Sequence, residues 1–332
     1  MLVVGRNGSG KTNLLESLHV GTQGFSPRTR VDGQLVRFGT EEARVAVAGR
    51  RAEVPVEVEL RLARSGKRAT LNGARLRAAE QLRTELATLV FTPDRLALVK
   101  GGPAARRAYF DRTLGRISPS RAALPAEYGA AVGQRNAALR RIVGGFSSRD
   151  AIEPWTERVA QLGAELVAAR REVTGLLEDG FASRAEEFGL PDGRLRYDAE
   201  APTRADLDAR LERDLERGAT GIGPHLDDVA ILAGERELRS FGSQGEQRLT
   251  VLALLLAEAE LVTERRGEPP LLLLDDVLSE LDPERRRILA ARLGDYGQAL
   301  ITATSVSALP VEAAQTLEIR LGDTGLSEVA AA

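Results

Sequence analysis

The stretch "LVVGRNGSGKT", residues 2–12, joins a short apolar run to a glycine-rich loop. The loop matches G-x-x-x-x-G-K-[ST], and its surroundings predict a buried strand before it and a helix from about Lys11 to Val20. In that context backbone N–H groups surround phosphates, the lysine neutralises the β and γ oxygens, and the threonine hydroxyl can bind Mg²⁺. The stretch therefore predicts an α/β fold that binds a nucleoside triphosphate and Mg²⁺. The predicted nucleotide contacts are Gly5, Arg6, Asn7, Gly8, Ser9, Gly10, Lys11 and Thr12, with Lys11 catalytic and Thr12 a metal ligand.

A second acidic motif follows a run of four leucines near the other end of the chain. The run Leu271–Leu274, bounded by proline and aspartate, is typical of a central strand in a parallel sheet. Asp275 closes the strand and is the predicted second Mg²⁺ ligand, while Asp276 is placed to orient the attacking water. The alternative is that the two carboxylates only cap the strand end. Together with the glycine-rich loop, the pair predicts nucleotide hydrolysis.

Bulk composition narrows the class of protein. The chain has 332 residues, 43% of them hydrophobic and 28% charged, which indicates a globular protein of about two domains. It has no cysteine, and its two histidines, His19 and His225, are far apart, which argues against a zinc site. The longest apolar run, Leu249–Ala257, is too short to span a bilayer, so we expect a cytoplasmic protein with no membrane contact. The net charge of −2 means that any nucleic-acid binding depends on a local basic patch.

The pattern along the chain predicts a split domain. Segments 43–50, 54–63 and 67–76, with the turn "LNGA", predict an antiparallel sheet with one wet face. Residues 103–217 read as helical, with apolar residues at helical spacing from Trp155 to Phe181, a helix capped by Ser118 or Ser120, and a loop at 191–204. Strand signals return after Gly221. We therefore expect an α/β domain, 1–102 and 218–332, interrupted by an all-helical lobe at 103–217.

A second anion-binding turn occurs at "FGSQGEQRL", residues 241–249, where a polar loop enters a long apolar helix. It resembles the signature loop of ATP-binding-cassette ATPases, in which the loop of one subunit closes over the nucleotide held by the other. In this reading Ser243 and Gly245 face the partner chain's ATP. The segment "SELD", Ser279–Asp282, resembles the adjoining dimer-contact loop, which makes Asp282 a further nucleotide contact. The alternative is a plain helix N-cap formed by Ser243.

Six stretches, taken together and in order, resemble the RecF family of bacterial DNA replication and repair proteins. They are "GRNGSGKTNLLESLHV" (5–20), "FSPRTRVDGQLVRFG" (25–39), "FTPDRLALVKGGPAARRAYFDR" (91–112), "GIGPHLDDVAI" (221–231), "FGSQGEQRLTVLALLLAEAEL" (241–261) and "LLLLDDVLSELDPERRRIL" (271–289). The resemblance implies an ATPase head of the ATP-binding-cassette type, with a mixed sheet, flanking helices and the inserted lobe. It also implies an ATP-gated homodimer that binds DNA at gaps or junctions and hydrolyses ATP slowly. Such a dimer would support recombinase loading, with partners of the RecR and RecO type, and the SOS response.

Several positions depart from the pattern of the family or of its relatives. The family carries a hairpin of strands before the glycine-rich loop, whereas this chain begins at Met1, so we expect one exposed sheet edge. Leu226 stands where a basic residue is usual, and Arg6 where proline is usual. Asp276 is one methylene shorter than the usual glutamate, and Thr304 occupies the place of the switch histidine of transporters. These last two features favour slow turnover, which suits a switch.

Candidate DNA contacts are arginines, because arginine can bind backbone phosphates without reading sequence. The candidates are Arg28, Arg30, Arg106, Arg107, Arg112, Arg135, Arg140 and Arg141. The alternative for each is a solvated helix face. Aromatic residues form only 4% of the chain, which favours backbone contacts with duplex or duplex–single-strand junctions over a stacking platform.

Three other functions remain open from the sequence. A transporter ATPase subunit predicts a switch histidine, a shorter insert and a glutamine at the lobe boundary, and we find none of these in the sequence. A long-coil chromosome organiser needs hundreds of heptad residues between the motifs, far more than residues 103–217 provide. A truncated, non-hydrolysing DNA-binding module is disfavoured by the intact Lys11, Thr12 and Asp275.

Overall fold

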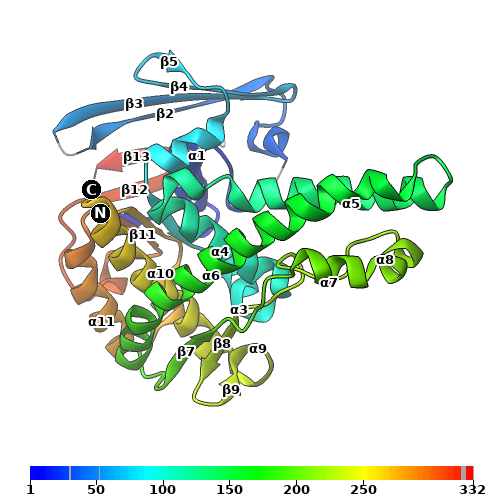
Figure 1. The fold of residues 1–332 in the computed structure, drawn as a ribbon. Helices are drawn as coiled ribbons and strands as arrows, with labels where there is room; N and C mark the ends of the chain where they lie inside the picture. The colour runs from blue at the N-terminus through cyan, green and yellow to red at the C-terminus, as the bar shows by residue number, and fades with distance from the viewer. Residues whose placement is uncertain (30, 52, 323–326, 332) are drawn as a thin grey trace. The chain divides into compact units, whose positions relative to one another are not determined.

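The computed structural model describes residues 1–29, 31–51, 53–322 and 327–331 (Figure 1). The chain divides into two compact units. Unit 1 comprises Met1–Leu96, Arg184–Leu190 and Ser243–Ala332, and unit 2 comprises Ala97–Ser183 and Pro191–Gly242. The second unit thus extends beyond the predicted lobe at 103–217, because a strand near residue 195 pairs with one near residue 231 and draws residues 218–242 with it.

Unit 1 is built on a sheet whose described strands lie in the order β13-β12-β1-β11-β10-β6. All neighbouring pairs are parallel except β12 with β13. The strands are β1 (Leu2–Val4), β6 (Thr88–Phe91), β10 (Leu271–Leu274), β11 (Ala299–Ala303), β12 (Thr316–Leu321) and β13 (Ser327–Ala331). β1 lies between β11 and β12, so it is an interior strand of this sheet. The carboxyl ends of β1, β10 and β11 consequently lie side by side.

The central strands are apolar because helices cover them. β10 is hydrogen-bonded on both edges, and Leu272, Leu273 and Leu274 are completely buried, as the unbroken leucine run predicted. Leu15 packs with Leu273 in one apolar cluster of this core. The helices of unit 1 are α1 (Lys11–Gln23), α2 (Leu82–Glu85), α10 (Gln244–Arg266) and α11 (Pro283–Leu293), together with the last residues of α6 (Glu153–Glu187).

The predicted antiparallel sheet is also present in unit 1. It consists of β2 (Glu42–Arg51), β3 (Val54–Ala63), β4 (Gly66–Leu71) and β5 (Ala74–Arg75). The turn between β4 and β5 places Asn72 at φ 49° and Gly73 at φ 78°, the left-handed conformations that an Asn-Gly hairpin supplies. Alternate residues of β3, including Val58, Leu60 and Leu62, are buried, which confirms the one-sided pattern. Among the described strands β2 pairs only with β3, so it is an edge strand of this sheet.

Unit 2 is mainly helical but contains a small sheet, which corrects the expectation of an all-helical lobe. Its helices are α3 (Ala97–Lys100), α4 (Pro103–Ile117), α5 (Leu124–Val143), most of α6, α7 (Arg204–Ala209), α8 (Leu211–Arg217) and α9 (Leu238–Phe241). Its strands are β7 (Gly193–Arg196), β8 (Ala230–Ala233) and β9 (Arg236–Glu237). β7 falls inside the predicted loop at 191–204, because strand pairing with β8 outweighs the proline and glycine that flank it.

The start of α5 differs from the prediction as well. Ser118 ends α4, and α5 begins at Leu124 with Ala123 at its N-cap, which makes no side-chain cap. Pro125, whose fixed φ suits the first helical turn, is the signal that marks this start. In the described part of the chain no helix has the length and apolar character needed to cross a membrane.

Candidate nucleotide-binding site

The glycine-rich loop runs from the end of β1 to the first turn of α1. Gly8 and Gly10 have φ of 81° and 104°, which side chains rarely adopt. At Gly5 a Cβ atom would lie 2.5 Å from the carbonyl oxygen of Ile319 and 2.6 Å from Ser9 Oγ, so the loop is too tight for any other residue. Gly10 is the N-cap of α1 and provides no side-chain acceptor, which leaves the N–H groups of the first turn open to an anion.

Lys11 lies along the inside of this loop. Its side chain is almost completely buried, with the residue 9% exposed. Nζ donates hydrogen bonds to the carbonyl oxygens of Gly5 at 2.7 Å and Arg6 at 3.0 Å. The ammonium group is therefore held at the loop by backbone acceptors, the position from which it can neutralise a bound phosphate.

A chain of hydrogen bonds joins three segments at the carboxyl edge of the sheet. Thr12 Oγ1 donates to Asp275 Oδ2 at 2.9 Å, and Thr302 Oγ1 donates to Asp275 Oδ1 at 2.8 Å. The N–H of Asp276 donates to Thr302 Oγ1 at 2.8 Å. Each oxygen of the buried Asp275 carboxylate thus accepts a hydrogen bond, and the two bonds fix the orientation of the carboxylate. We did not identify Thr302 from the sequence; its signal is its place in the strand β11, beside the strand that ends at Asp275.

A pocket of about 310 Å³ opens over this arrangement. Its described lining consists of Asn7, Gly8, Gly10, Lys11, Thr12, Asn13, Arg28, Asp275, Asp276 and Thr302. The structure therefore brings the predicted phosphate loop and the predicted acidic pair into one site. A hydroxyl and a carboxylate are the hard oxygen ligands that Mg²⁺ prefers, with phosphates and water completing its octahedron. Among the described residues no group of three or more histidine, cysteine, aspartate or glutamate side chains could hold a metal ion.

Arg28, predicted as a DNA contact, lies in this pocket. Its Nη1 is 3.1 Å from Glu16 Oε2, and its side chain is 45% exposed. Ser26 Oγ donates to the other oxygen of Glu16 at 2.5 Å and accepts the N–H of Arg28 at 3.0 Å. These contacts hold the segment after α1 against the helix, and Arg28 lines the same pocket as the phosphate loop. Arg30, the neighbouring candidate, lies outside the described residues.

The signature-like turn is an exposed helix start. Ser243 Oγ accepts the N–H of Glu246 at 3.2 Å, and Glu246 Oε2 accepts the N–H of Ser243 at 2.7 Å, which together form a capping box. Ser243 and Gly245 are exposed, and neither is among the described residues that line the 310 Å³ pocket. Asp282 likewise caps α11 by accepting the N–H of Arg285 at 2.9 Å, a bond that lowers the pKa of Asp282. Local capping is thus observed at both turns, and it leaves their outer surfaces open.

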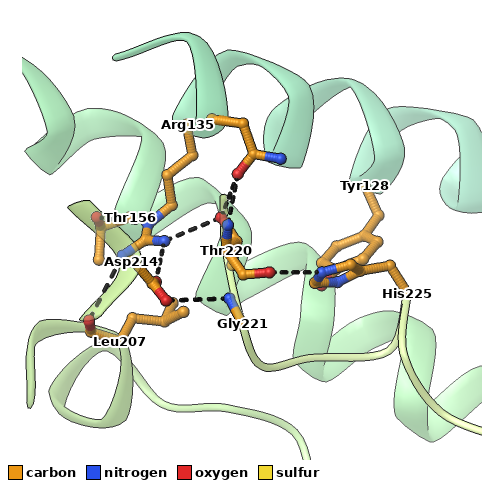
Figure 2. A network of polar contacts seen from close by, with 9 residues as sticks. Tyr128, Arg135, Thr156, Leu207, Asp214, Thr220, Gly221 and His225 are labelled. Carbon is orange, nitrogen blue, oxygen red and sulfur yellow. Dashed lines mark hydrogen bonds and ion pairs between the residues drawn. The ribbon is translucent and has the colours of Figure 1, made fainter. Parts of the chain in front are cut away.

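Two of the arginines predicted to contact DNA are buried. Arg106 is 1% exposed and donates to both oxygens of Asp228 at 2.7 and 2.6 Å. Arg135 is 0% exposed and donates to Asp214 Oδ2 at 2.7 Å and Thr220 Oγ1 at 2.9 Å (Figure 2). A guanidinium so enclosed cannot reach a DNA phosphate, so the structure removes Arg106 and Arg135 from the candidate contacts. The helical spacing in the sequence could not distinguish these inward-facing arginines from solvated ones.

The other arginine candidates of unit 2 remain at least partly exposed to solvent. Arg107 is half-buried, its Nη1 donates to the carbonyl oxygen of Asp227 at 2.5 Å, and burial lowers its pKa. Arg112 is half-buried as well. Arg140 and Arg141, near the end of α5, are exposed, and Arg140 donates a long bond of 3.4 Å to the carbonyl oxygen of Gly218. Arg140 and Arg141 are the most accessible of the described candidates in unit 2.

Comparison with known proteins identifies relatives of this chain. The model of the RecF/RecN/SMC N terminal domain family matches residues 1–327. The chain is similar to the DNA replication and repair proteins RecF of Heliobacterium modesticaldum (36% identical, covering 99% of this chain and 91% of that one) and Symbiobacterium thermophilum (38% identical, covering 93% and 86%). Among solved structures it is similar to the recombination mediator protein RecF-ATP in the RecFOR pathway, with a TM-score of 0.87, 29% identity and coverage of 99% and 91%.

A more distant likeness concerns the fold alone. The Smc head domain of Pyrococcus furiosus matches with a TM-score of 0.58 at 17% identity. These matches confirm the predicted fold class, an ATPase head of the ATP-binding-cassette type with a mixed sheet and flanking helices. The family model matches residues 1–327, and the two RecF proteins are more than 30% identical over nearly the whole chain. The chain therefore belongs to the RecF family of DNA replication and repair proteins.

Proposed function

We propose that this chain is an ATP-dependent DNA-binding protein of recombinational repair and replication restart, and that it acts as an ATP-gated homodimer. The proposal is supported by one observation: the two predicted anion-binding features of unit 1 do not line the same pocket. The phosphate loop, Thr12 and Asp275 converge on one pocket, whereas the exposed turn at Ser243 is not among the described residues of that pocket. A second chain that presents Ser243 and Gly245 to the nucleotide would complete the site.

The residues of the pocket have distinct roles in this proposal. The loop N–H groups and Lys11 hold the triphosphate, and Thr12 with Asp275 would hold Mg²⁺, which neutralises charge that develops on the phosphates. Asp276 lines the pocket, and its backbone is anchored through its N–H to Thr302, so its carboxylate is placed to orient water. The short side chain of Asp276 favours slow hydrolysis, which keeps the ATP-bound dimer long-lived.

DNA would bind through backbone phosphates. The accessible candidates are Arg140 and Arg141, with Arg107 and Arg112 contributing their exposed portions, while Arg28 belongs to the nucleotide pocket in this proposal. The preferred substrate is gapped or junction DNA, where the dimer would support recombinase loading and the SOS response in the cytoplasm. Partners of the RecR and RecO type are inferred from the name RecFOR given to the pathway of a similar structure.

The test is the molar mass in solution, measured by light scattering with Mg²⁺ and either ATP or ADP. We expect a dimer with ATP and a monomer with ADP, and we expect Lys11→Met and Ser243→Arg each to abolish the dimer. Binding of ATP itself, measured by calorimetry, should be lost in Lys11→Met and retained in Ser243→Arg, because the first variant disrupts the chain's own site and the second the partner's site. A wild-type chain that binds ATP but stays monomeric would refute the gated dimer.

A further inference from the structure

An ion pair joins two separate segments of unit 1. Arg248, near the start of α10, contacts Glu280, the last residue of a 3₁₀ turn at Val277–Glu280, with Nη1 2.5 Å from Oε2. The two side chains are 34% and 21% exposed, so water screens the pair only in part. With Phe91 and Pro93 they help to line a cavity of about 20 Å³, which has room for about one water molecule. The pair is therefore a defined contact between α10 and the 3₁₀ turn.

The first of these segments is the helix start that carries the signature-like turn. Arg248 lies about one helical turn beyond Ser243 and Gly245. The capping box of Ser243 with Glu246 and the bond from Thr250 Oγ1 to the carbonyl oxygen of Glu246, at 2.7 Å, hold this part of α10 in regular helical form. A contact made by Arg248 therefore restrains the helix end that presents Ser243 and Gly245.

The second segment continues directly from the acidic pair. Ser279 Oγ donates to the carbonyl oxygen of Asp276 at 2.8 Å. Arg286 Nε, from α11, donates to the carbonyl oxygen of Leu278 at 2.8 Å. These bonds give the backbone between Asp276 and Glu280 one defined path. The carboxylate of Glu280 is thus tied to the segment that begins at the proposed water-orienting residue and continues into the dimer-contact segment Ser279–Asp282.

We propose that Arg248 is a positioning residue, whose ion pair with Glu280 holds the Ser243 turn and the segment Ser279–Asp282 in one arrangement for a second copy of this chain. This inference rests on the proposed ATP-gated dimer, in which both elements face the partner's nucleotide. Ordering two loops in advance lowers the entropic cost of forming an interface, so the pair should strengthen the dimer. Arg248 and Glu280 are not among the described residues that line the 310 Å³ pocket, so the chain's own ATP binding should not depend on them.

The test measures the dimer and the chain's own ATP binding separately. Light scattering over a range of protein concentrations, with Mg²⁺ and ATP, gives the dimer dissociation constant. We expect Arg248→Gln and Glu280→Gln each to raise this constant by about tenfold, as the loss of a partly shielded ion pair should. Calorimetry in the Ser243→Arg background, where the chain should stay monomeric, should give the same ATP affinity with and without Arg248→Gln. Arg44→Gln, which breaks an ion pair of 2.7 Å in the antiparallel sheet, is the matched control and should dimerise normally.

Charge reversal separates positioning from a general effect on stability. Arg248→Glu and Glu280→Arg each place like charges together and should weaken the dimer further, whereas the double variant restores an ion pair and should recover the dimer. A merely structural role would lower the free energy of unfolding and leave the dimer constant of the folded chain unchanged. Wild-type dimer constants in both glutamine variants, or a double variant that does not recover, would refute the positioning pair. Failure of the underlying dimer proposal looks different, because wild type itself would then stay monomeric with ATP.

Discussion

Thr12 Oγ1 and Asp275 Oδ2 are 2.9 Å apart, although 263 positions separate the two residues in the chain. The contact forms because β1 and β10 flank β11 in a parallel arrangement, which brings their carboxyl ends to one edge of the sheet. The phosphate loop and the acidic strand therefore face a common pocket. That geometry underlies the first prediction.

Asp275→Asn should retain the shape of the site and remove the charge that holds Mg²⁺. We expect the rate of ATP hydrolysis to fall by at least about 100-fold, because metal stabilisation of the transferring phosphoryl group supplies several kcal/mol. Phosphate release measures the rate, and ATP binding in EDTA should change little. Asp94→Asn, which neutralises an exposed carboxylate of unit 1, is the control and should hydrolyse ATP at the normal rate. A normal rate in Asp275→Asn would exclude this carboxylate as a metal ligand.

Ser243→Asp should separate helix capping from anion binding. Aspartate caps a helix as well as serine does, so the free energy of unfolding should remain near the wild-type value, whereas Ser243→Ala should lose about 1 kcal/mol. The added charge would repel the phosphates of a partner's ATP, so the ATP-dependent dimer should be lost in light scattering. Thr203→Asp alters a second capping box, at α7, and should dimerise normally. A dimer in Ser243→Asp would mean that the turn is only a helix cap.

Arg135→Met should destabilise the protein strongly. The side chains of Arg135 and Asp214 are both 0% exposed, so the substitution leaves a buried carboxylate without its charge partner. We expect the free energy of unfolding to fall by about 3–5 kcal/mol, measured by urea denaturation. Arg141→Met, on the exposed surface of α5, should change it by less than about 0.5 kcal/mol. Equal effects of the two substitutions would contradict a structural role for Arg135.

Arg140→Ala and Arg141→Ala should weaken DNA binding through the phosphates. Each lost phosphate contact should reduce the slope of log K against log salt concentration by about 0.9. The slope is measured by titrating labelled gapped duplex at several salt concentrations. Arg149→Ala is a suitable control, because Arg149 is also exposed near the end of α5 but is paired with Glu212. Unchanged slopes in both variants would place the DNA contacts elsewhere.

His225 should make stability depend on pH. Thr220 O can only accept, so Nε2 must donate to it at 3.1 Å (Figure 2). In the neutral ring Nδ1 then accepts from the Tyr128 hydroxyl at 2.9 Å. Burial lowers the pKa of His225 below the value of 6.5 for the unfolded chain, so the unfolded state binds more protons between the two values. The free energy of unfolding should therefore fall as pH drops through 6.5.

The variant His225→Gln isolates this contribution. Its side-chain amide can donate to Thr220 O but does not titrate. The stability advantage of wild type over the variant should shrink between pH 8 and pH 5, measured by urea denaturation at each pH. A constant difference across that range would show that the imidazole keeps its proton affinity on folding.

The parts of the fold that the sequence predicts well are those fixed by local chemistry. The loop at Gly5–Thr12, the leucine strand β10 and the Asn72-Gly73 turn follow from backbone conformation and side-chain patterning within a few residues. The predictions that were wrong concern residues whose structure depends on partners distant in the chain. β7 needs β8 to form a strand, and the burial of Arg106 is decided by Asp228, 122 positions away.

The candidate site shows the same division. The phosphate loop and the acidic pair could be named from their motifs, and their meeting in one pocket follows from parallel strands. Thr302 and Arg28 could not be assigned to the pocket, because a threonine in a strand and an arginine in a loop carry no motif of their own. Only the pairing of β11 beside β10 and the packing of residues 26–28 against Glu16 place them there.

The backbone at Asp276 restricts which residues can replace it. Its φ of 52° lies in the left-handed region, where asparagine, aspartate and glycine are tolerated and most other residues cost about 1–2 kcal/mol. Asp276→Asn and Asp276→Gly should therefore lower the free energy of unfolding less than Asp276→Val does, measured by urea denaturation. Asp276→Asn would remove the carboxylate while keeping both the turn and the N–H bond to Thr302. This variant would serve to trap the proposed ATP-bound dimer for imaging.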